Sequence, residues 1–333
     1  MKLKITFKTK AFMFSTGMLT ALIIIEMGIR LFLPQSDRFY STYPQDLFHK
    51  PNKVGYWYGE NPYSREFAVK ININSFGLRD NEIRREKLPE TIRIAVVGDS
   101  FVESFQVDLE NTFLKILEHQ LHDKYSKNFE VINFGKAGLG PVGKKRMFLE
   151  SLSFDPNIVL VSLNSTDYVD WQNEQNALMT KKSFLHNLAG DLTEISHLAR
   201  LVVRTSIIKK PFHQADNSNP TSKSPNRNQV ETKNKISQEV SEITRVSEEK
   251  NILVIFILDE ISRNKVSCNS HINLLEDILK ENDAPVISLT PIFCEHHDLE
   301  KFYFNRDGHW TVEGHKKVAE AVFQFLSLNN FVD

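Results

Sequence analysis

The sequence predicts an α/β fold in which a sheet of parallel strands is preceded by one apolar N-terminal helix. Two observations carry this expectation. From residue 92 onward short apolar runs alternate with amphipathic stretches, and residues 11–33 form one long apolar segment. The runs of strand length, mostly rich in β-branched residues, are 94–97, 130–134, 158–163, 252–258 and 285–289. Near-continuous apolar runs are typical of parallel strands that are covered on both faces.

The stretches between these runs have helical spacing, which provides the right-handed crossovers that parallel strands require. They are residues 112–121, 142–152, 272–279 and a last helix with Val318, Ala319, Val322, Phe323 and Leu326 on one stripe. Residues 184–208 are also expected to be helical, although they interrupt the alternation. Residues 211–235 are rich in Asn, Ser, Pro, Lys and Gln, which predicts a disordered insertion.

The expected organisation has three parts. Residues 1–34 form a short cytoplasmic region and a transmembrane anchor. Residues 35–90 are aromatic-rich and irregular, which predicts a loop-rich lead-in with a hairpin around 67–74. Residues 91–330 form the α/β domain, with 211–235 as an insertion in it.

The apolar segment 11–33 is long enough to cross a bilayer as a helix, which needs about 20 residues. Glu26 and Arg30 interrupt it, but their i,i+4 spacing allows them to pair. Neither a small-x-small cleavage pattern nor a lipobox cysteine follows the segment, which favours an uncleaved anchor over a removed signal peptide. Four lysines precede the segment, so we expect a single-pass protein of the inner (cytoplasmic) membrane whose later residues lie on the periplasmic or extracellular side.

Composition narrows the class of protein. With 41% hydrophobic and 25% charged residues the chain is globular, and a net charge of −1 without a basic stripe predicts no nucleic-acid partner. The two cysteines, Cys268 and Cys294, do not make a disulfide framework. They are compatible with one bridge or with two buried thiols.

The strongest local motif ends the first predicted strand, as Gly98-Asp99-Ser100. Ligands of open α/β sheets bind beyond the carboxyl ends of the strands, where a serine at a helix start would meet them. Taken alone, the tripeptide favours a helix cap, which is the usual role of Ser and Asp at such a position.

A second motif near the C-terminus contains Asp307-Gly308-His309. A serine hydroxyl needs a base to act as a nucleophile, and a histidine oriented by a carboxylate suits this role. The alternative is a surface loop with incidental histidines, an interpretation that also fits His315. A metal site is disfavoured because Cys294, Glu295, His296, His297 and this pair have no recognised zinc spacing. We expect neither a metal nor another cofactor.

Two further loops follow predicted strands. The loop after the second strand contains Gly138, among glycines that let backbone N–H groups approach a ligand, as an oxyanion hole requires. The turn after the third strand, Asn164-Ser165-Thr166-Asp167, offers side-chain donors at the same sheet edge. Each is also compatible with an ordinary turn.

Together these blocks resemble those of the SGNH/GDSL hydrolases, in the same order, over roughly residues 92–326. The extended forms GDSFVES, NSFGLRD at 74–80 and DGHW at 307–310 resemble anchored members associated with cell-envelope polysaccharides. The resemblance implies a flavodoxin-like three-layer α/β/α sandwich with a parallel five-stranded sheet, and carboxylic-ester chemistry. It implies a triad of Ser100, His309 and Asp307. The implied oxyanion hole combines the N–H groups of Ser100 and Gly138 with a third donor, Thr166 or Asn164.

Two departures from the family pattern stand out. Many members carry Gly-x-Asn-Asp in the third block, where this chain has Thr166 at the asparagine position. The last block is Asp-x-His rather than Asp-x-x-His, a spacing that resembles the alginate O-acetyltransferase branch. The expected function is a serine esterase acting on acyl esters, above all O-acetyl esters, of a cell-envelope glycan or lipid. The alternatives are an O-acyltransferase with the same triad and a non-catalytic carbohydrate-binding or assembly factor.

Overall fold

The computed structural model describes residues 6–40, 46–59, 65–179, 184–208, 227–261, 274–296 and 298–332. They belong to two compact units. One comprises Met1–Arg38 with Lys182–Thr221, and the other comprises Phe39–Lys181 with Ser222–Asp333. Each unit is described by itself below. Cys268 and residues 211–226 of the predicted insertion lie outside the described residues.

The larger unit contains the predicted parallel sheet. Its strands are β3 (Thr91–Gly98), β4 (Asn128–Gly135), β5 (Ile158–Asn164), β6 (Leu253–Asp259) and β7 (Val286–Ser288). They are parallel and lie in the order β4-β3-β5-β6-β7. Counted along the chain this is the order 2-1-3-4-5 of the flavodoxin-like doubly wound fold. The predicted fold class is therefore confirmed.

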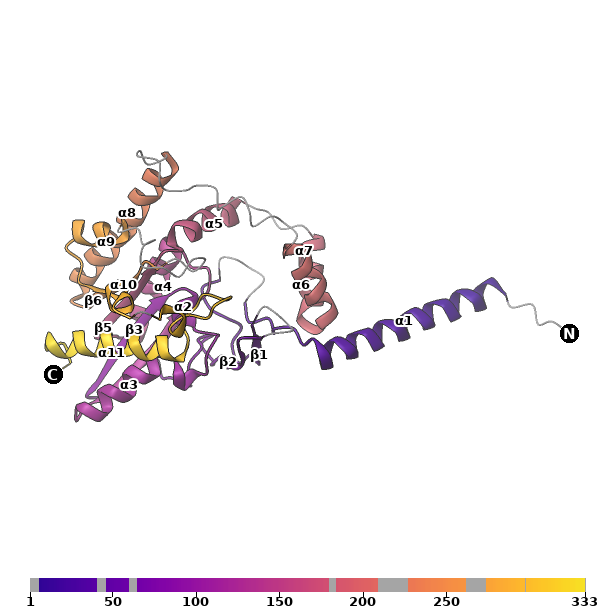
Figure 1. The fold of residues 1–333 in the computed structure, drawn as a ribbon, viewed down its shortest axis with the longest axis horizontal. Coiled ribbons are helices and arrows are strands. Elements are labelled where there is room, and N and C mark those ends of the chain that lie inside the picture. The colour runs from indigo at the N-terminus through magenta and orange to yellow at the C-terminus, as the bar shows by residue number, and fades with distance from the viewer. Residues whose placement is uncertain are drawn as a thin grey trace. The chain divides into compact units, whose positions relative to one another are not determined.

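Helices cover both faces of the sheet. The face with Ile94 and Val96 packs against α3 (Phe113–Lys124) and α11 (Val312–Leu328). The face with Ala95 and Val97 packs against α4 (Pro141–Ser151), α8 (Arg227–Lys250) and α9 (Leu274–Glu281). The three layers can be followed in Figure 1. Because alternate residues of β3 are buried on opposite faces, the strand is apolar at nearly every position, as the sequence predicted.

The remaining elements of this unit are short or lie at strand ends. They are β1 (Val54–Tyr58), β2 (Ala68–Asn72), α2 (Ser100–Glu103), α5 (Asp167–Met179), α10 (Leu289–Cys294) and the 3-10 turns Leu109–Asn111, Leu152–Phe154 and Leu299–Lys301. β1 and β2 pair antiparallel in a separate sheet. A hairpin was expected within residues 67–74. In the structure these residues contribute only β2, and its partner strand β1 lies earlier in the lead-in.

The lead-in is tied to the α/β domain by buried charges. The guanidinium of Arg79 donates to the backbone carbonyls of Glu103, Ser104 and Val107. The neighbouring carboxylate of Asp80 forms an ion pair with Lys115 at 2.8 Å and accepts a hydrogen bond from the β4 backbone. The NSFGLRD segment therefore holds the start of the domain rather than forming a detachable linker.

One sequence expectation is corrected here. The insertion was predicted to be disordered up to residue 235, but α8 begins at Arg227, so residues 227–235 are helical. Their largely polar composition is that of the first turns of an amphipathic helix whose buried stripe begins at Thr232 and continues through Ile236 and Val240. Ion pairing between Lys235 and Glu239 at 2.9 Å supports those turns.

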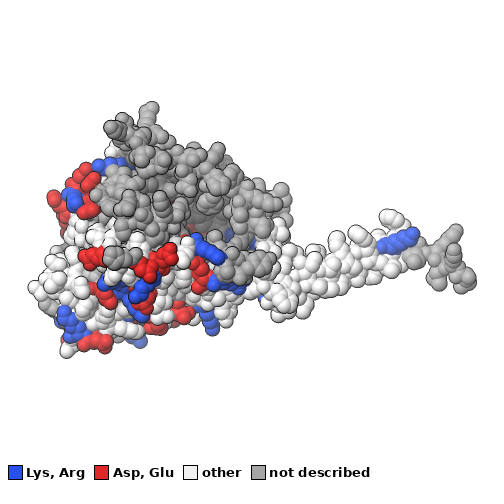
Figure 2. Space-filling model, viewed as in Figure 1, with Lys and Arg blue, Asp and Glu red and all other residues white. Residues whose placement is uncertain are grey.

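The smaller unit contains α1 (Phe7–Phe32), α6 (Phe184–Ile195) and α7 (His197–Ile208). Among the described residues, α1 is the one helix that is long and apolar enough to cross a membrane, a description that a signal sequence also meets. Its apolar side chains are exposed, Phe14 by 73% and Phe32 by 81%. Figure 2 shows α1 as an almost uncharged surface, whereas acidic and basic side chains are interspersed on the visible face of the larger unit.

His315 is not the surface histidine that the sequence suggested. It lies in the second turn of α11, is buried, and accepts a hydrogen bond from the backbone N–H of Phe113 at 3.2 Å through Nδ1. Burial, reinforced by the positive charge of Arg79, lowers the pKa of His315 to about 3. Folding therefore keeps this imidazole neutral.

We expect this neutral histidine to make the fold sensitive to acid. Below about pH 6.5 the unfolded chain takes up a proton at His315 that the folded chain does not, so stability falls as the pH drops toward 3. The contribution lost between pH 7 and pH 4 is roughly 3 kcal/mol. Urea unfolding of the detergent-solubilised chain, compared with His315→Asn, which keeps an acceptor for Phe113, measures it. Parallel pH dependences for the two proteins would contradict the prediction.

Candidate active site

Ser100 lies at the carboxyl end of β3, where α2 begins. The carboxylate of Asp99 caps this helix by accepting a hydrogen bond from the backbone N–H of Phe101 at 3.0 Å. β4 passes so close to the turn that a Cβ on Gly135 would lie 2.2 Å from the backbone nitrogen of Glu103. Close packing of α2 against β4 therefore requires glycine at this position and holds Ser100 rigidly at the sheet edge.

The late motif brings its two side chains onto this serine. His309 Nε2 lies 2.6 Å from Ser100 Oγ, and His309 Nδ1 is hydrogen-bonded to the Asp307 carboxylate. Gly308 takes φ = +76°, a left-handed conformation that turns the backbone so that its two neighbours face each other. The three residues predicted as a triad thus form one continuous hydrogen-bonded chain.

A buried carboxylate at the end of β6 holds the loop that carries the histidine. Asp259 accepts hydrogen bonds from Trp310 Nε1 at 2.9 Å and from the Tyr303 hydroxyl at 3.0 Å. Burial raises the pKa of Asp259 to about 6, although these hydrogen bonds favour the charged form. Because Trp310 follows His309 directly in the chain, the hydrogen bond between Trp310 and Asp259 helps to fix the position of the histidine.

The segments that follow β3, β4 and β5 meet at a buried ammonium group. Lys144, in α4, lies 2.9 Å from Asp99 and 2.7 Å from Asp167, and each of these side chains is buried. Burial disfavours both carboxylates, yet the pKa of Asp99 is lowered by Lys144. The pKa of Asp167 is raised to about 7 by burial and by Asp99, despite Lys144. One ammonium thus serves two carboxylates, of which Asp99 keeps its charge more readily.

The polar groups of the third block are engaged by other protein groups. Asn164 Nδ2 donates to Asp99 at 2.6 Å. The Thr166 hydroxyl lies 2.8 Å from Asn164 Oδ1 and 2.9 Å from Asp170 Oδ2. Both residues are therefore at the sheet edge where the sequence placed them, with their side chains turned toward these partners.

The glycine loop supplies backbone groups. Gly138 takes φ = +77°, and the N–H of Ala137 next to it donates to the Glu103 carboxylate at 3.0 Å. The backbone N–H groups of Ser100 and Gly138 make no hydrogen bond to any other described residue. Glu103 in turn pairs with His49 at 2.7 Å, so the lead-in fixes the loop.

Gln106 is a site residue that sequence reasoning missed. Its side chain is buried, and its amide nitrogen lies 3.0 Å from His309 Nδ1. It follows the GDSFVES motif in the chain, but nothing in the local pattern indicates that the next residues return to the histidine.

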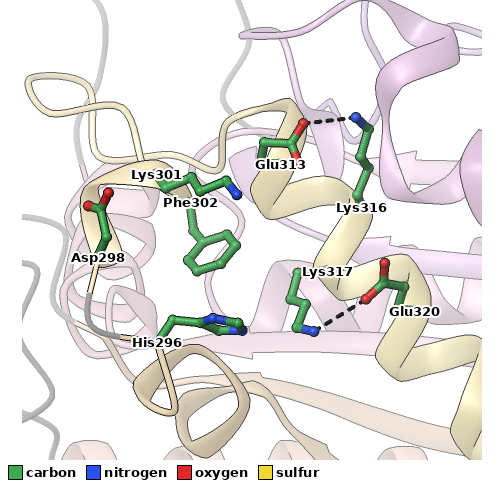
Figure 3. Close-up of a pocket in the computed structure, with 8 residues that line it drawn as sticks. All are labelled: His296, Asp298, Lys301, Phe302, Glu313, Lys316, Lys317 and Glu320. Atoms are coloured by element: carbon green, nitrogen blue, oxygen red, sulfur yellow. Dashed lines mark hydrogen bonds and ion pairs between the residues drawn. The ribbon is translucent and has the colours of Figure 1, made fainter.

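A separate surface pocket opens beside the first turns of α11 (Figure 3). It is lined by His296, Asp298, Lys301, Phe302, Glu313, Lys316, Lys317 and Glu320. No triad residue lines it. Two of its lysines are already paired, Lys316 with Glu313 at 2.8 Å and Lys317 with Glu320 at 3.3 Å.

Cys294, considered above as a metal ligand, is disulfide-bonded, and His297 lies outside the described residues.

Comparisons with known proteins complete these observations. A scan of protein-family models and a search of curated sequences found no match. Solved structures do match. A lipolytic protein of the G-D-S-L family from Desulfitobacterium hafniense is 13% identical with a TM-score of 0.43, over 70% of this chain and 98% of that one. A lipase/acylhydrolase from Enterococcus faecalis is 13% identical with a TM-score of 0.44, over 72% and 96%. An acetyl xylan esterase is 14% identical with a TM-score of 0.42, over 71% and 100%.

The chain's own geometry carries the structural assignment. The sheet has the flavodoxin-like strand order, a serine follows its first parallel strand, and an aspartate and a histidine reach that serine from the last loop. Together these features give the chain the fold of the SGNH/GDSL hydrolases.

Proposed function

We propose that this protein is a membrane-anchored serine esterase with Ser100 as nucleophile, His309 as general base and Asp307 as the residue that orients the base. The observation that carries the proposal is the chain of hydrogen bonds from Asp307 through His309 to Ser100 Oγ. A histidine with one nitrogen on a carboxylate and the other on a hydroxyl is the arrangement that activates a serine.

In this mechanism Ser100 Oγ attacks the carbonyl carbon of an ester while His309 Nε2 takes its proton. The tetrahedral intermediate collapses to an acyl-enzyme, and His309 returns the proton to the departing alcohol. Water, activated by the same histidine, then releases the acid. Asp307 remains ionised and stabilises the imidazolium that forms in each half of the cycle.

The negative charge on the carbonyl oxygen needs donors. The backbone N–H groups of Ser100 and Gly138 suit this role, because no other described residue uses them. The sequence suggested Thr166, or Asn164, as a third donor. We regard an oxyanion hole with this third donor as the less favoured form of the proposal, because the Thr166 hydroxyl would have to turn away from Asn164 and Asp170.

The substrate class in this proposal comes from the sequence resemblance, which favours O-acetyl groups on a cell-envelope glycan or lipid. An O-acyltransferase would use the same triad and differ only in whether a sugar hydroxyl replaces water at the acyl-enzyme. A non-catalytic carbohydrate-binding or assembly factor is disfavoured, since such a factor would have no need for His309 to lie 2.6 Å from Ser100 Oγ.

An uncleaved α1, with the larger unit on the periplasmic or extracellular side, forms part of the proposal. The carboxylate of Glu26 accepts hydrogen bonds from the backbone N–H groups of His197 and Leu198, both at 2.9 Å. Removal of α1 as a signal peptide would leave these N–H groups at the start of α7 without their acceptor. This contact favours a helix that is kept.

Replacing Ser100 or His309 by Ala is expected to lower kcat for a chromogenic acetyl ester by roughly four to six orders of magnitude, since the two residues act as a unit. The double variant should be scarcely worse than either single one. Asp307→Asn should cost less, because a misoriented histidine still acts occasionally as a base. Steady-state hydrolysis by the detergent-solubilised chain measures all four. Full activity in Ser100→Ala would end the proposal.

Thr166→Val separates the two forms of the oxyanion hole. We expect a loss in kcat of less than about tenfold, because the hydroxyl is held by Asn164 and Asp170, whereas removing a true oxyanion donor costs about a hundredfold or more. KM should change little. A hundredfold fall in kcat would instead identify Thr166 as the third donor, as the sequence suggested.

Gln106 is proposed as a positioning residue for His309. With Asp307 ionised, Nδ1 of His309 carries the proton, so the Gln106 amide must turn its oxygen toward that N–H. With Nε2 facing His309, Gln106 Oε1 is buried without a partner among the described residues, which supports the turned amide.

Opposite pH shifts are therefore expected from two substitutions of this residue. Gln106→Glu adds negative charge beside the imidazolium and should move the acidic limb of the kcat/KM profile to higher pH, while Gln106→Leu should move it to lower pH. Gln106→Leu should also lower kcat by roughly two- to tenfold, the value of one hydrogen bond. Identical pH profiles for the wild type and both variants would assign Gln106 a purely structural role.

A further inference from the structure

The C-terminal half of α1 carries a carboxylate, Glu26, that a bilayer does not tolerate without a partner. At 1.5 Å per residue, the roughly 20 residues that cross about 30 Å of hydrocarbon extend from Ala11 to the vicinity of Arg30. Glu26 therefore lies near the far boundary of the hydrocarbon. An ionised carboxylate at such a depth needs partners within the protein.

The start of α7 supplies those partners. One oxygen of Glu26 accepts from Arg30 Nε at 2.7 Å and from the His197 N–H at 2.9 Å, and the other accepts from the Leu198 N–H and the Ser196 hydroxyl, both at 2.9 Å. The first N–H groups of a helix have no partner within it and are costly to bury away from water. The carboxylate and the helix start therefore satisfy each other at the same depth.

Polar contacts hold the helix pair against the end of α1. The backbone N–H of Gln35 donates to His197 Nδ1 at 2.9 Å, and Arg38 donates to the Gly190 carbonyl at 2.8 Å. Arg200 pairs with Asp37 at 2.9 Å. Figure 1 shows α6 and α7 beside the C-terminal end of α1. The three helices thus form one small unit around the point where α1 would leave the bilayer.

Apolar side chains of this pair remain exposed. Ile195 is 69% exposed, Val202 55% and Leu192 48%. We infer that α6 and α7 lie in the lipid headgroup boundary of the bilayer that α1 spans, with these three side chains inserted into it. The occupant of the apolar face is thus lipid, because the Glu26 contact sets the pair at the depth of the hydrocarbon boundary. This inference rests on the proposed anchor.

The test places a fluorescent non-natural amino acid, one position at a time, in the full chain reconstituted in phosphatidylcholine vesicles with or without nitroxide-labelled phosphatidylcholine. The fluorescence of labels at Ile195 and Val202 should be several-fold lower in vesicles with the nitroxide lipid than in vesicles without it. The same is expected of a label at Leu22 in α1. A label at Glu249, an exposed residue of α8, should lose none. If Leu22 is quenched but Ile195 or Val202 is not, this inference fails and the anchor stands. If Leu22 is not quenched, the anchor itself fails.

The Glu26 contact is tested in the same vesicles. Glu26→Ala should reduce quenching at Ile195 and Val202 and leave Leu22 unchanged, because it removes the acceptor for the start of α7. Thr20→Ala is the matched control, since the Thr20 hydroxyl is bonded within α1 to the Thr16 carbonyl. Undiminished quenching at Ile195 and Val202 in Glu26→Ala would show that Glu26 does not set the depth of the pair and would overturn that part of the inference.

Discussion

The geometry of the proposed active site depends on one buried ammonium group. Lys144 joins Asp99, the residue before the proposed nucleophile, to Asp167, the first residue of α5. It extends from α4, the helix that follows the glycine loop. Removing one partner of a buried ion pair leaves an uncompensated charge and typically costs about 3–5 kcal/mol. Three chain segments, distant in sequence, can therefore shift only together. Rigidity of this kind keeps a serine within hydrogen-bond reach of a histidine on a separate loop.

Much of the fold and the triad was predictable because it depends on local signals. Strands buried on both faces are apolar at nearly every position, so runs such as 158–163 are visible without any knowledge of their neighbours. A nucleophile in a strand-to-helix turn and an Asp-Gly-His segment need particular residue types at short spacing. Ser100, Asp307 and His309 were identified from these short motifs together with the family resemblance that the motifs carry, and the structure brings them together.

What escaped prediction depends on contacts between distant segments. In the sequence, Lys144 looks like a surface residue of α4. Its burial follows only from the carboxylates of Asp99 and Asp167, with which it pairs. His315 and Gln106 likewise acquire their roles from Phe113 and His309, far away in the chain. Residues 227–235 contain a single apolar residue, Val230, so composition favoured disorder, whereas helical continuity with the buried stripe of α8 decided the outcome.

Glu103 determines where the catalytic module begins. Its carboxylate bonds His49 at 2.7 Å and the Tyr40 hydroxyl at 2.8 Å on one side, and Ala137 beside Gly138 on the other. A gene fusion joined at the first residue of β3 would keep every strand of the parallel sheet and all three triad residues. It would nevertheless leave this carboxylate without its lead-in partners and release the glycine loop. A transplantable module must therefore begin before Tyr40, and the irregular lead-in belongs with the site that it supports.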